Sequence, residues 1–265
     1  MQNLQYLKEG KMGVYVFITC VAVLLLILLI IYRTRFWGRP KEVHNPKVSW
    51  TRAWIVFCII SIISWVTGTM DRILSNPIVT PEQLKDPQWI AWTAGCFVLI
   101  FVAYWIIWAK WTVVFDRKLY LVPQVIFGMV WGASIAQIFL LFWFFAGIFG
   151  FPIWGRWILA FLMMSFHGLW MDLYWDVYVL PEHDTPWSLK SKVICSHIPN
   201  MLACLTYLAI YNNLGIFIIL QAFALTGAAV SMRVPPFWEK DYINPPRTAP
   251  GLFGLPHAVG YIEEE

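Results

Sequence analysis

The hydrophobic residues of this chain fall into long uninterrupted runs that are separated by short polar segments. A helix needs about 20 apolar residues to cross a bilayer, and no run alternates apolar and polar residues as a membrane β-strand would. The pattern therefore predicts an all-α fold, a polytopic membrane helical bundle. We expect seven transmembrane helices, over residues 12–32, 52–70, 88–110, 119–148, 152–178, 190–211 and 214–232.

The distribution of Lys and Arg predicts how these helices are oriented. With the N-terminus outside, the inside segments hold fourteen of the 19 Lys and Arg residues and the outside segments hold five. Because basic residues concentrate on the cytoplasmic side, we expect an outside N-terminus and a cytoplasmic C-terminus. The turns at 149–152 and 212–215 are expected to be very short.

The chain divides into a seven-span bundle, residues 1–232, and a cytoplasmic C-terminal tail, residues 233–265. The tail is rich in Pro and ends in three Glu residues. Pro excludes a helix over much of this length. We expect a flexible tail, or alternatively a tail whose apolar stretch "GLFGLPHAVGY" docks on the cytoplasmic face or on a partner subunit.

The composition agrees with a multi-pass membrane protein. Hydrophobic residues make up 60% of the chain and charged residues 13%, a balance that a soluble domain of this size could not hide. The first apolar run is too long for a signal peptide and no small-residue cleavage site follows it, so we expect a retained span. The net charge of +4 is modest and no glycine-rich phosphate loop is present, which gives no reason to expect a nucleic-acid partner.

Aromatic residues and cysteines have simple structural interpretations. The 17 Trp and 11 Tyr residues gather near predicted span ends, as in "WIIWAKW" (105–111). We interpret most of them as interfacial anchors, while a minority could line a pocket for a flat or polyene-like ligand. The five cysteines occur singly in apolar runs, so we interpret them as small hydrophobic residues. Tyr104, Ser134, Gln137 and Gln221 are expected to join helices by hydrogen bonds.

The stretch "MDLYWDVYVLPEHD" (171–184) contains the acids that most need explaining. Asp172 and Asp176 are the two acids of the chain that fall inside a predicted span, near its cytoplasmic end. Their i, i+4 spacing places both carboxyl groups on one helix face. Two neighbouring carboxylates are suited to sharing a proton or to holding a metal ion. The sequence does not decide whether a metal or another cofactor is bound.

The next predicted span brings further polar residues to the same depth. His197 and Asn200 lie about two turns from its cytoplasmic end, and the short connection makes the two spans antiparallel neighbours. We therefore expect Asp172, Asp176 and His197 to form a catalytic site. Its expected substrate-binding residues are Asn200, His167 and Trp175.

Each of these residues also has an ordinary structural interpretation. Asp176 could mark the point where the helix meets water, and His197 could be a hydrogen-bonded core residue. The segment 181–186 has the prolines and the Asp-Thr-Pro sequence of a turn. Asp172 could form an ion pair with a basic residue, namely Lys110, Arg117 or Lys192.

We expect an integral-membrane enzyme that acts on a lipophilic substrate, such as an isoprenoid, sterol-like or fatty compound. One aspartate would be the general acid, His197 the base or orienting partner, and Asn200 a hydrogen-bond donor. Cyclase, isomerase and lyase reactions fit this chemistry. The size, the seven spans and the inward C-terminus resemble those of small integral-membrane terpene cyclases, a resemblance of architecture that implies protonation by a carboxyl group.

Other functions compete with this one. The spacing D-x-x-x-D resembles a divalent-ion clamp of UbiA-type prenyltransferases, but the second acidic motif of that family is missing. The five histidines lack the HxxxH and HxxHH spacings of membrane hydroxylases. The main alternative is a non-catalytic subunit of a larger membrane complex, possibly an oxidoreductase, with the basic 33–52 loop and the tail as contact surfaces. A small transporter is third, because no polar path runs through the spans.

Overall fold

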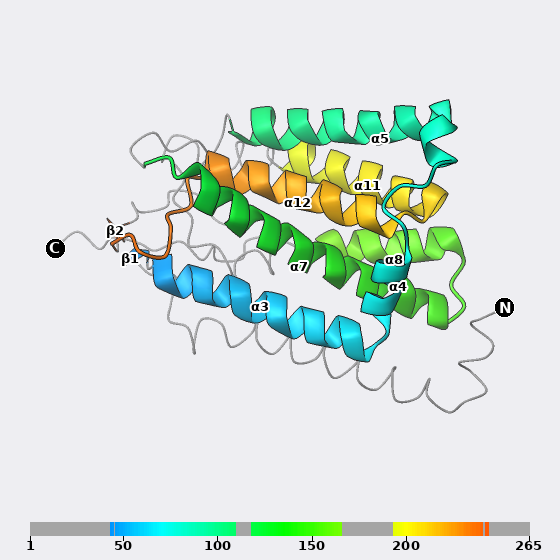
Figure 1. The fold of residues 1–265 in the computed structure, drawn as a ribbon, viewed down its shortest axis with the longest axis horizontal. Helices are drawn as coiled ribbons and strands as arrows, with labels where there is room; N and C mark the ends of the chain where they lie inside the picture. Colours follow the sequence, from blue (N-terminus) through cyan, green and yellow to red (C-terminus); the bar gives the residue numbers. More distant parts are fainter. Residues whose placement is uncertain (1–42, 45, 110–117, 166–192, 241, 244–265) are drawn as a thin grey trace.

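The computed structural model describes residues 43–44, 46–109, 118–165, 193–240 and 242–243, which form a bundle of helices (Figure 1). A two-residue antiparallel ladder joins β1 to β2. The elements in chain order are β1 (Val43–His44), α3 (Pro46–Val66), α4 (Thr69–Ser75), η1 (Gln83–Lys85), α5 (Pro87–Ile100), η2 (Phe101–Ile107), α7 (Leu121–Ile148), α8 (Ile153–Ser165), η4 (Val193–His197), α11 (Ile198–Tyr211), α12 (Leu214–Ser231) and β2 (Tyr242–Ile243).

Five of the described helices are long and apolar enough to cross a membrane, which confirms the all-α membrane bundle at this level. The helix over 153–162 is apolar but shorter. The first predicted span, 12–32, and the end of the fifth, 166–178, lie outside the described residues. The total of seven spans and the outside N-terminus therefore stay predictions. The five helices cover Ser49–Val66, Pro87–Ile107, Leu121–Ile148, Ile194–Tyr211 and Leu214–Ser231.

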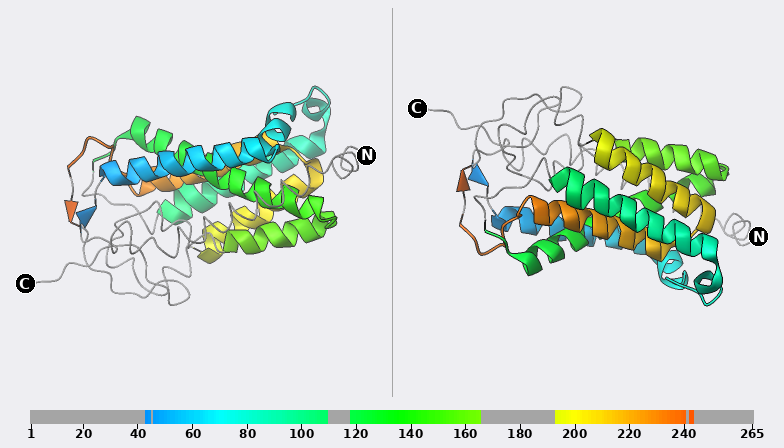
Figure 2. Two further views of the ribbon diagram at one scale, coloured as in Figure 1. Left: turned by 90° about the horizontal axis from the view of Figure 1, so that it is seen from below. Right: turned by 90° about the horizontal axis from the view of Figure 1, so that it is seen from above.

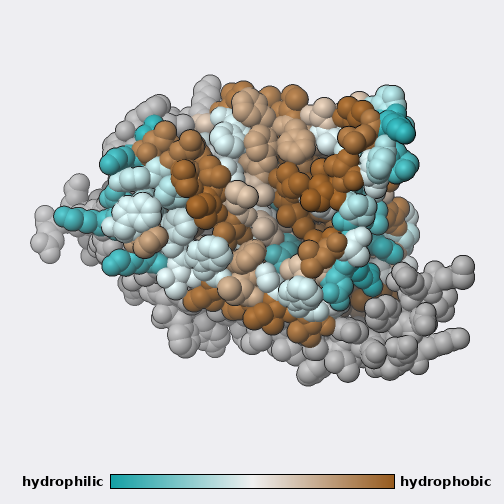
Figure 3. All heavy atoms as spheres, in the orientation of Figure 1, coloured by the Kyte–Doolittle hydropathy of each residue, from teal (hydrophilic) through white to brown (hydrophobic). Residues whose placement is uncertain are grey.

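The surface of the bundle has the polarity of a membrane-crossing protein. Brown, hydrophobic residues occupy the middle of the face shown in Figure 3, and teal, hydrophilic residues gather toward its two ends. On α3 the large side chains Ile62 and Trp65 are more than half exposed, at 61% and 53%. In water such a surface would cause aggregation, whereas in a bilayer it contacts acyl chains of the same polarity.

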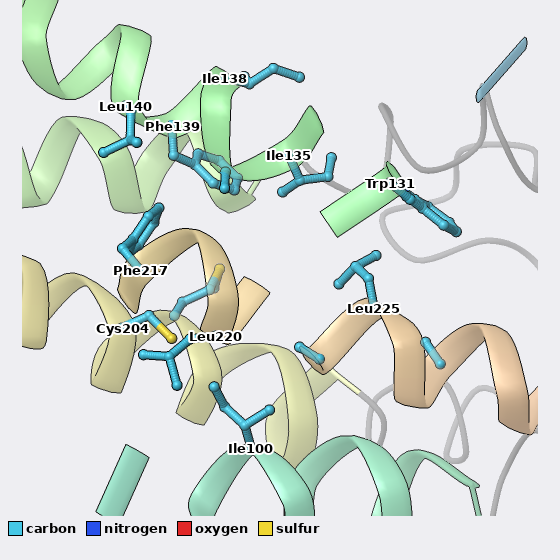
Figure 4. Packing of buried hydrophobic residues seen from close by; sticks show 14 of the residues in the cluster. Ile100, Trp131, Ile135, Ile138, Phe139, Leu140, Cys204, Phe217, Leu220 and Leu225 are labelled. Atoms are coloured by element: carbon cyan, nitrogen blue, oxygen red, sulfur yellow. The ribbon is translucent and has the colours of Figure 1, made fainter. Parts of the chain in front are cut away.

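Helix α7 lies at the centre of the bundle, in contact with α3, α8 and α12 (Figure 1; Figure 2). In an apolar window of 18 residues, 72% of the residues are buried in α7 and in α12, against 22% in the span that begins at Pro87. Side chains of α7 and α12 interdigitate in the core, as Figure 4 shows for Phe139 and Ile135 of α7 beside Phe217 and Leu225 of α12. The central helices are thus held by apolar contacts on most sides.

Two glycines bring α7 and α12 unusually close together. A Cβ atom built on Gly128 would lie 2.4 Å from Cα of Thr226, and one built on Gly132 would lie 2.4 Å from Cα of Ala222. No side chain fits at either position, so the two backbones touch directly. Small residues spaced four apart permit this kind of close packing between membrane helices, where dispersion takes the place of the hydrophobic effect.

At one end of the bundle, asparagine side chains tie the turns together. The turn between α11 and α12 places Asn212 in the left-handed region, at φ 47°, and the side chain of Asn213 accepts a hydrogen bond from the Ile216 amide at 3.0 Å. Asn213 also donates to the Ile78 carbonyl, at 2.8 Å, while Asn76 donates to the Asn212 carbonyl, at 3.2 Å. The expected short turns are confirmed at 149–152 and at 212–213.

At the other end, the chain that leaves α12 folds back over the bundle. The indole N–H of Trp50 donates to the Pro235 carbonyl at 2.9 Å, and Val234 is buried. The Tyr120 hydroxyl donates to the Glu239 carboxylate, which raises the pKa of Tyr120. The first residues of the predicted tail thus pack against the bundle, whereas residues 244–265, with the apolar stretch, lie outside the described residues.

Candidate functional site

The structure describes two of the six predicted site residues. His197 ends η4 and Asn200 lies in the first turn of α11. The other four residues, Asp172, Asp176, His167 and Trp175, belong to the segment 166–192, which lies outside the described residues. Their convergence with His197 therefore stays a prediction.

His197 lies where two π-helical segments meet. Segment η4 leads directly into α11, where Pro199 has no N–H to donate to the Cys195 carbonyl and its ring would clash with that carbonyl. A wider turn before the proline removes this conflict. The facing segment η2 continues α5, and its widened register lets the Trp108 amide bond to the Ala103 carbonyl five residues earlier. The Ser196 hydroxyl donates to the same carbonyl at 2.9 Å and so joins the two segments.

The central contact of the site is a hydrogen bond between Tyr104 of η2 and His197. The Tyr104 hydroxyl oxygen lies 2.7 Å from Nδ1 of His197. Trp108 packs against both rings, with its centroid 5.8 Å from that of Tyr104 and 5.0 Å from that of His197. Tyr104 is 1% exposed, while His197 is half-buried. The pair therefore connects the bundle interior to its edge.

Further polar groups extend this contact into the bundle. The Asn200 side chain is a hydrogen-bond partner of the Tyr104 hydroxyl. The Cys204 thiol donates to Oδ1 of Asn200 at 3.0 Å, and the Gln221 side chain lies near Cys204, with its Nε2 unpaired among the described residues. Asn200, Cys204 and Gln221 are all at most 2% exposed. Hydrogen bonds thus run from His197 through Tyr104 and Asn200 to Cys204, and Gln221 of α12 lies at the end of this row.

The direction of the hydrogen bond between Tyr104 and His197 depends on the tautomer of His197. Oδ1 of Asn200 accepts from Cys204, so the Asn200 amide nitrogen is the group that donates to Tyr104. The Tyr104 hydroxyl donates to His197 Nδ1 if the imidazole proton is on Nε2, and it accepts from Nδ1 if the proton is there. We propose the neutral tautomer of His197 that has its proton on Nε2, because Nδ1 then accepts the single proton of the Tyr104 hydroxyl.

Several residues of the site differ from their sequence interpretation. Tyr104 was expected to join helices by a hydrogen bond, which is confirmed, whereas Ser134 donates to the Val130 carbonyl of its own helix and Nε2 of Gln221 has no partner among the described residues. Trp108 was interpreted as an interfacial anchor but is 8% exposed and packs on His197. Cys204 was interpreted as a hydrophobic residue but is a hydrogen-bond donor.

Trp105, the other tryptophan of "WIIWAKW" that the structure describes, is also not a simple anchor. Its indole N–H donates to the Phe223 carbonyl at 3.2 Å, and its ring lies against Gly227, where a Cβ atom would come within 2.6 Å. The aromatic residues are packed between helices here because small residues on α12 leave room for their rings.

Within the parts of the chain that the structure describes, no group of three His, Cys, Asp or Glu side chains is placed to hold a metal ion. Compared with family models, curated proteins and solved structures, the chain shows no match. Its function is therefore inferred from the geometry of this site.

Proposed function

We propose that this protein is an integral-membrane enzyme that transforms a lipophilic substrate of isoprenoid, sterol-like or fatty type by acid–base chemistry. The observation that carries the proposal is the 2.7 Å hydrogen bond between the buried Tyr104 and the half-buried His197. A hydrogen-bonded Tyr–His pair in an apolar bundle is a costly arrangement that membrane proteins keep mainly for function.

His197 is the polarising group in this proposal. With Nδ1 occupied by Tyr104, its Nε2–H donates a hydrogen bond to an oxygen of the substrate or to a neighbouring carboxylate. A neutral imidazole that donates in this way polarises a carbonyl or epoxide without an ion being buried. The role of base, which the sequence left open for His197, is less suited to this tautomer.

Asp172 or Asp176 supplies the mobile proton. The two carboxyl groups share one proton, and the protonated one transfers it to the substrate while the other stabilises the developing positive charge. Protonation of an alkene or epoxide followed by proton loss elsewhere gives a cyclised or isomerised product, and bond cleavage gives a lyase product. Asn200 holds Tyr104, and His167 and Trp175 contact the hydrocarbon part of the substrate.

The proposal includes the complete topology. Seven spans with an outside N-terminus place the Tyr104–His197 pair near the cytoplasmic interface. A substrate can then enter from the bilayer with its polar end at headgroup level. The partners are the lipid bilayer and the lipophilic substrate, with no nucleic acid.

The test measures turnover of membrane lipids by the purified chain. Wild-type protein in detergent is incubated with extracted lipids, and mass spectrometry follows the loss of one lipid and the gain of a product, of equal mass for a cyclase or isomerase. We expect His197→Gln and Asp172→Asn or Asp176→Asn to reduce the rate about 100-fold, because positioned acid–base groups contribute this much. Tyr104→Phe should reduce it about tenfold, since it acts through His197.

Tyr207→Phe is the matched control. Tyr207 is as deeply buried as Tyr104, and its hydroxyl lies 3.0 Å from that of Thr93 rather than near His197. It should keep the wild-type rate. Equal losses in both Tyr variants, or loss of rate in proportion to loss of thermal stability, would contradict an enzymatic role and favour the alternative of a subunit in a larger complex.

A further inference from the structure

The end of the bundle away from His197 brings two arginines together. The guanidinium carbon of Arg72, on α4, lies 4.8 Å from the ring centroid of Phe144 on α7. The guanidinium of Arg156, on α8, lies flat against Gly147 of α7, where a Cβ atom would come within 2.7 Å of it. Figure 1 shows α4 beside the end of α7 at this end of the bundle.

The two guanidinium groups are neighbours. Phe144 and Gly147 are three residues apart on α7 and therefore lie on the same face, one turn apart. Consistent with this, the charge of Arg72 acts unfavourably on that of Arg156. Two like charges have thus been brought to the last turn of one helix.

The described surroundings neutralise these charges incompletely. The C-terminus of α7 offers about half a negative charge. The electrostatic neighbour of Arg156 among the described residues is Arg72, with no carboxylate contributing. Nε of Arg156 donates to the Phe151 carbonyl at 3.1 Å, which fixes its orientation but adds no charge. The groups that contact Arg156 therefore leave part of its positive charge uncompensated.

The surroundings also offer apolar surface. Phe149, Phe151 and Trp154, in the turn between α7 and α8 and the start of α8, are exposed by 54%, 48% and 65%. Cationic and apolar groups side by side at the end of a membrane helix match a lipid whose phosphate adjoins its acyl chains. Guanidinium groups bind phosphate oxygens through two parallel N–H donors, and the Nη atoms of both arginines can take this role.

From this juxtaposition we propose that Arg72 and Arg156 form a binding site for an anionic phosphate group. The phosphate comes from the headgroup of an anionic phospholipid or from free inorganic phosphate. The site is separate from the Tyr104–His197 pair, at the opposite end of α11, and it does not depend on the proposed enzymatic activity.

The test measures binding to the delipidated full chain in detergent. Native mass spectrometry and thermal unfolding are recorded during titration with phosphatidylglycerol, phosphatidylcholine and inorganic phosphate. We expect phosphatidylglycerol to bind and raise the unfolding temperature, and phosphatidylcholine to bind more weakly. The variant Arg72→Gln/Arg156→Gln should lose at least about tenfold in affinity, because charge-assisted hydrogen bonds are lost.

Lys85→Gln is the matched control, since Lys85 is an exposed cation at the same end of the bundle. It should bind like the wild type. An effect of inorganic phosphate equal to that of the lipid identifies free phosphate as the source. Equal affinities of the double variant and Lys85→Gln for every probe would overturn the proposal. If the double variant does not fold, the single variants Arg72→Lys and Arg72→Gln are compared instead. Weaker binding of phosphatidylglycerol by Arg72→Gln than by Arg72→Lys supports the site, and equal affinities of the two variants contradict it.

Discussion

Two helix contacts in the same bundle are built on opposite principles. Between α7 and α12, regular helices approach until their backbones touch at Gly128 and Gly132. Between η2 and η4, both helices widen into π-helical turns, and hydrogen bonds of Tyr104 and Ser196 cross the gap. The first contact is made by backbone atoms of small residues, and the second by directional polar side chains.

The difference shows where stability and chemistry are located. Close backbone contact gains dispersion energy along its whole length and leaves no space for a substrate. The π-helical contact has fewer close approaches, but it holds an imidazole at the bundle edge by a hydrogen bond. π-Helical turns are rare and frequently accompany functional sites. The α7–α12 contact therefore serves as the rigid support, and in the proposed function the η2–η4 contact is the reactive part.

The largest effect is expected from a single methyl group in the α7–α12 contact. In Gly132→Ala the new Cβ atom meets the Ala222 backbone at 2.4 Å, so the helices must separate. Overpacking of this kind costs about 3 kcal/mol. We expect a large fall in the unfolding temperature in detergent, followed by tryptophan fluorescence.

Gly95→Ala provides the control for helix propensity. Gly95 lies in α5 with no atom within 4 Å of a built Cβ. Since Ala favours a helix by about 0.5–1 kcal/mol over Gly, this variant should be slightly more stable than the wild type. The same substitution should thus have opposite signs at the two positions, and equal effects would show that α7 and α12 are not in backbone contact.

The sequence predicts much of the apolar framework but less of the contacts between helices. Run lengths and hydropathy identify the described spans and the short turns, because these depend on local composition. Gly128 and Gly132 form a small-xxx-small pattern on α7, which indicates close helix packing but contains no polar group. Pro199 could have indicated the widened turn of η4, whereas nothing in "FVAYWII" indicates that of η2.

The sequence also predicts only part of the candidate site, because it shows single polar residues but not the contacts between helices. His197 and Asn200 stand out as polar residues in an apolar run, so the sequence alone identifies them. Tyr104 belongs to the site because it is hydrogen-bonded to His197, 93 positions away in the sequence. Trp108 belongs to it because its ring packs on His197, whereas its sequence context is typical of an interfacial anchor. Contacts of this range depend on how helices pack, and periodicity does not report them.

The second prediction concerns the tautomer of His197. In Tyr104→Phe, Nδ1 loses its donor, which should cost about 2 kcal/mol of stability and remove the preference for the Nε2–H form. Nitrogen-15 NMR of histidine-labelled protein distinguishes the two tautomers, and the His197 signals are assigned with His197→Gln. We expect the Nε2–H form to predominate in the wild type and a mixture in the variant.

Tyr207→Phe again serves as the control, because it removes a buried hydroxyl that contacts Thr93. Its His197 signals should match those of the wild type. A wild-type spectrum with the proton on Nδ1 would show that Tyr104 accepts rather than donates. That result would remove the polarising role of Nε2–H even if the protein proved to be an enzyme.

The smallest effect tests whether the hydroxyl of Ser196 helps to hold the two π-helical segments together. Ser196→Ala removes the 2.9 Å bond to the Ala103 carbonyl, which still accepts from the Trp108 amide, so we expect a loss of about 1 kcal/mol. Ser134→Ala is the control: its hydroxyl bonds to the Val130 carbonyl of its own helix, and this substitution should be nearly neutral. Both variants are compared by thermal unfolding in one detergent. A larger loss for Ser134→Ala than for Ser196→Ala would mean that the polar contact between η2 and η4 contributes no stability of its own, and that packing around Trp108 holds His197 in place.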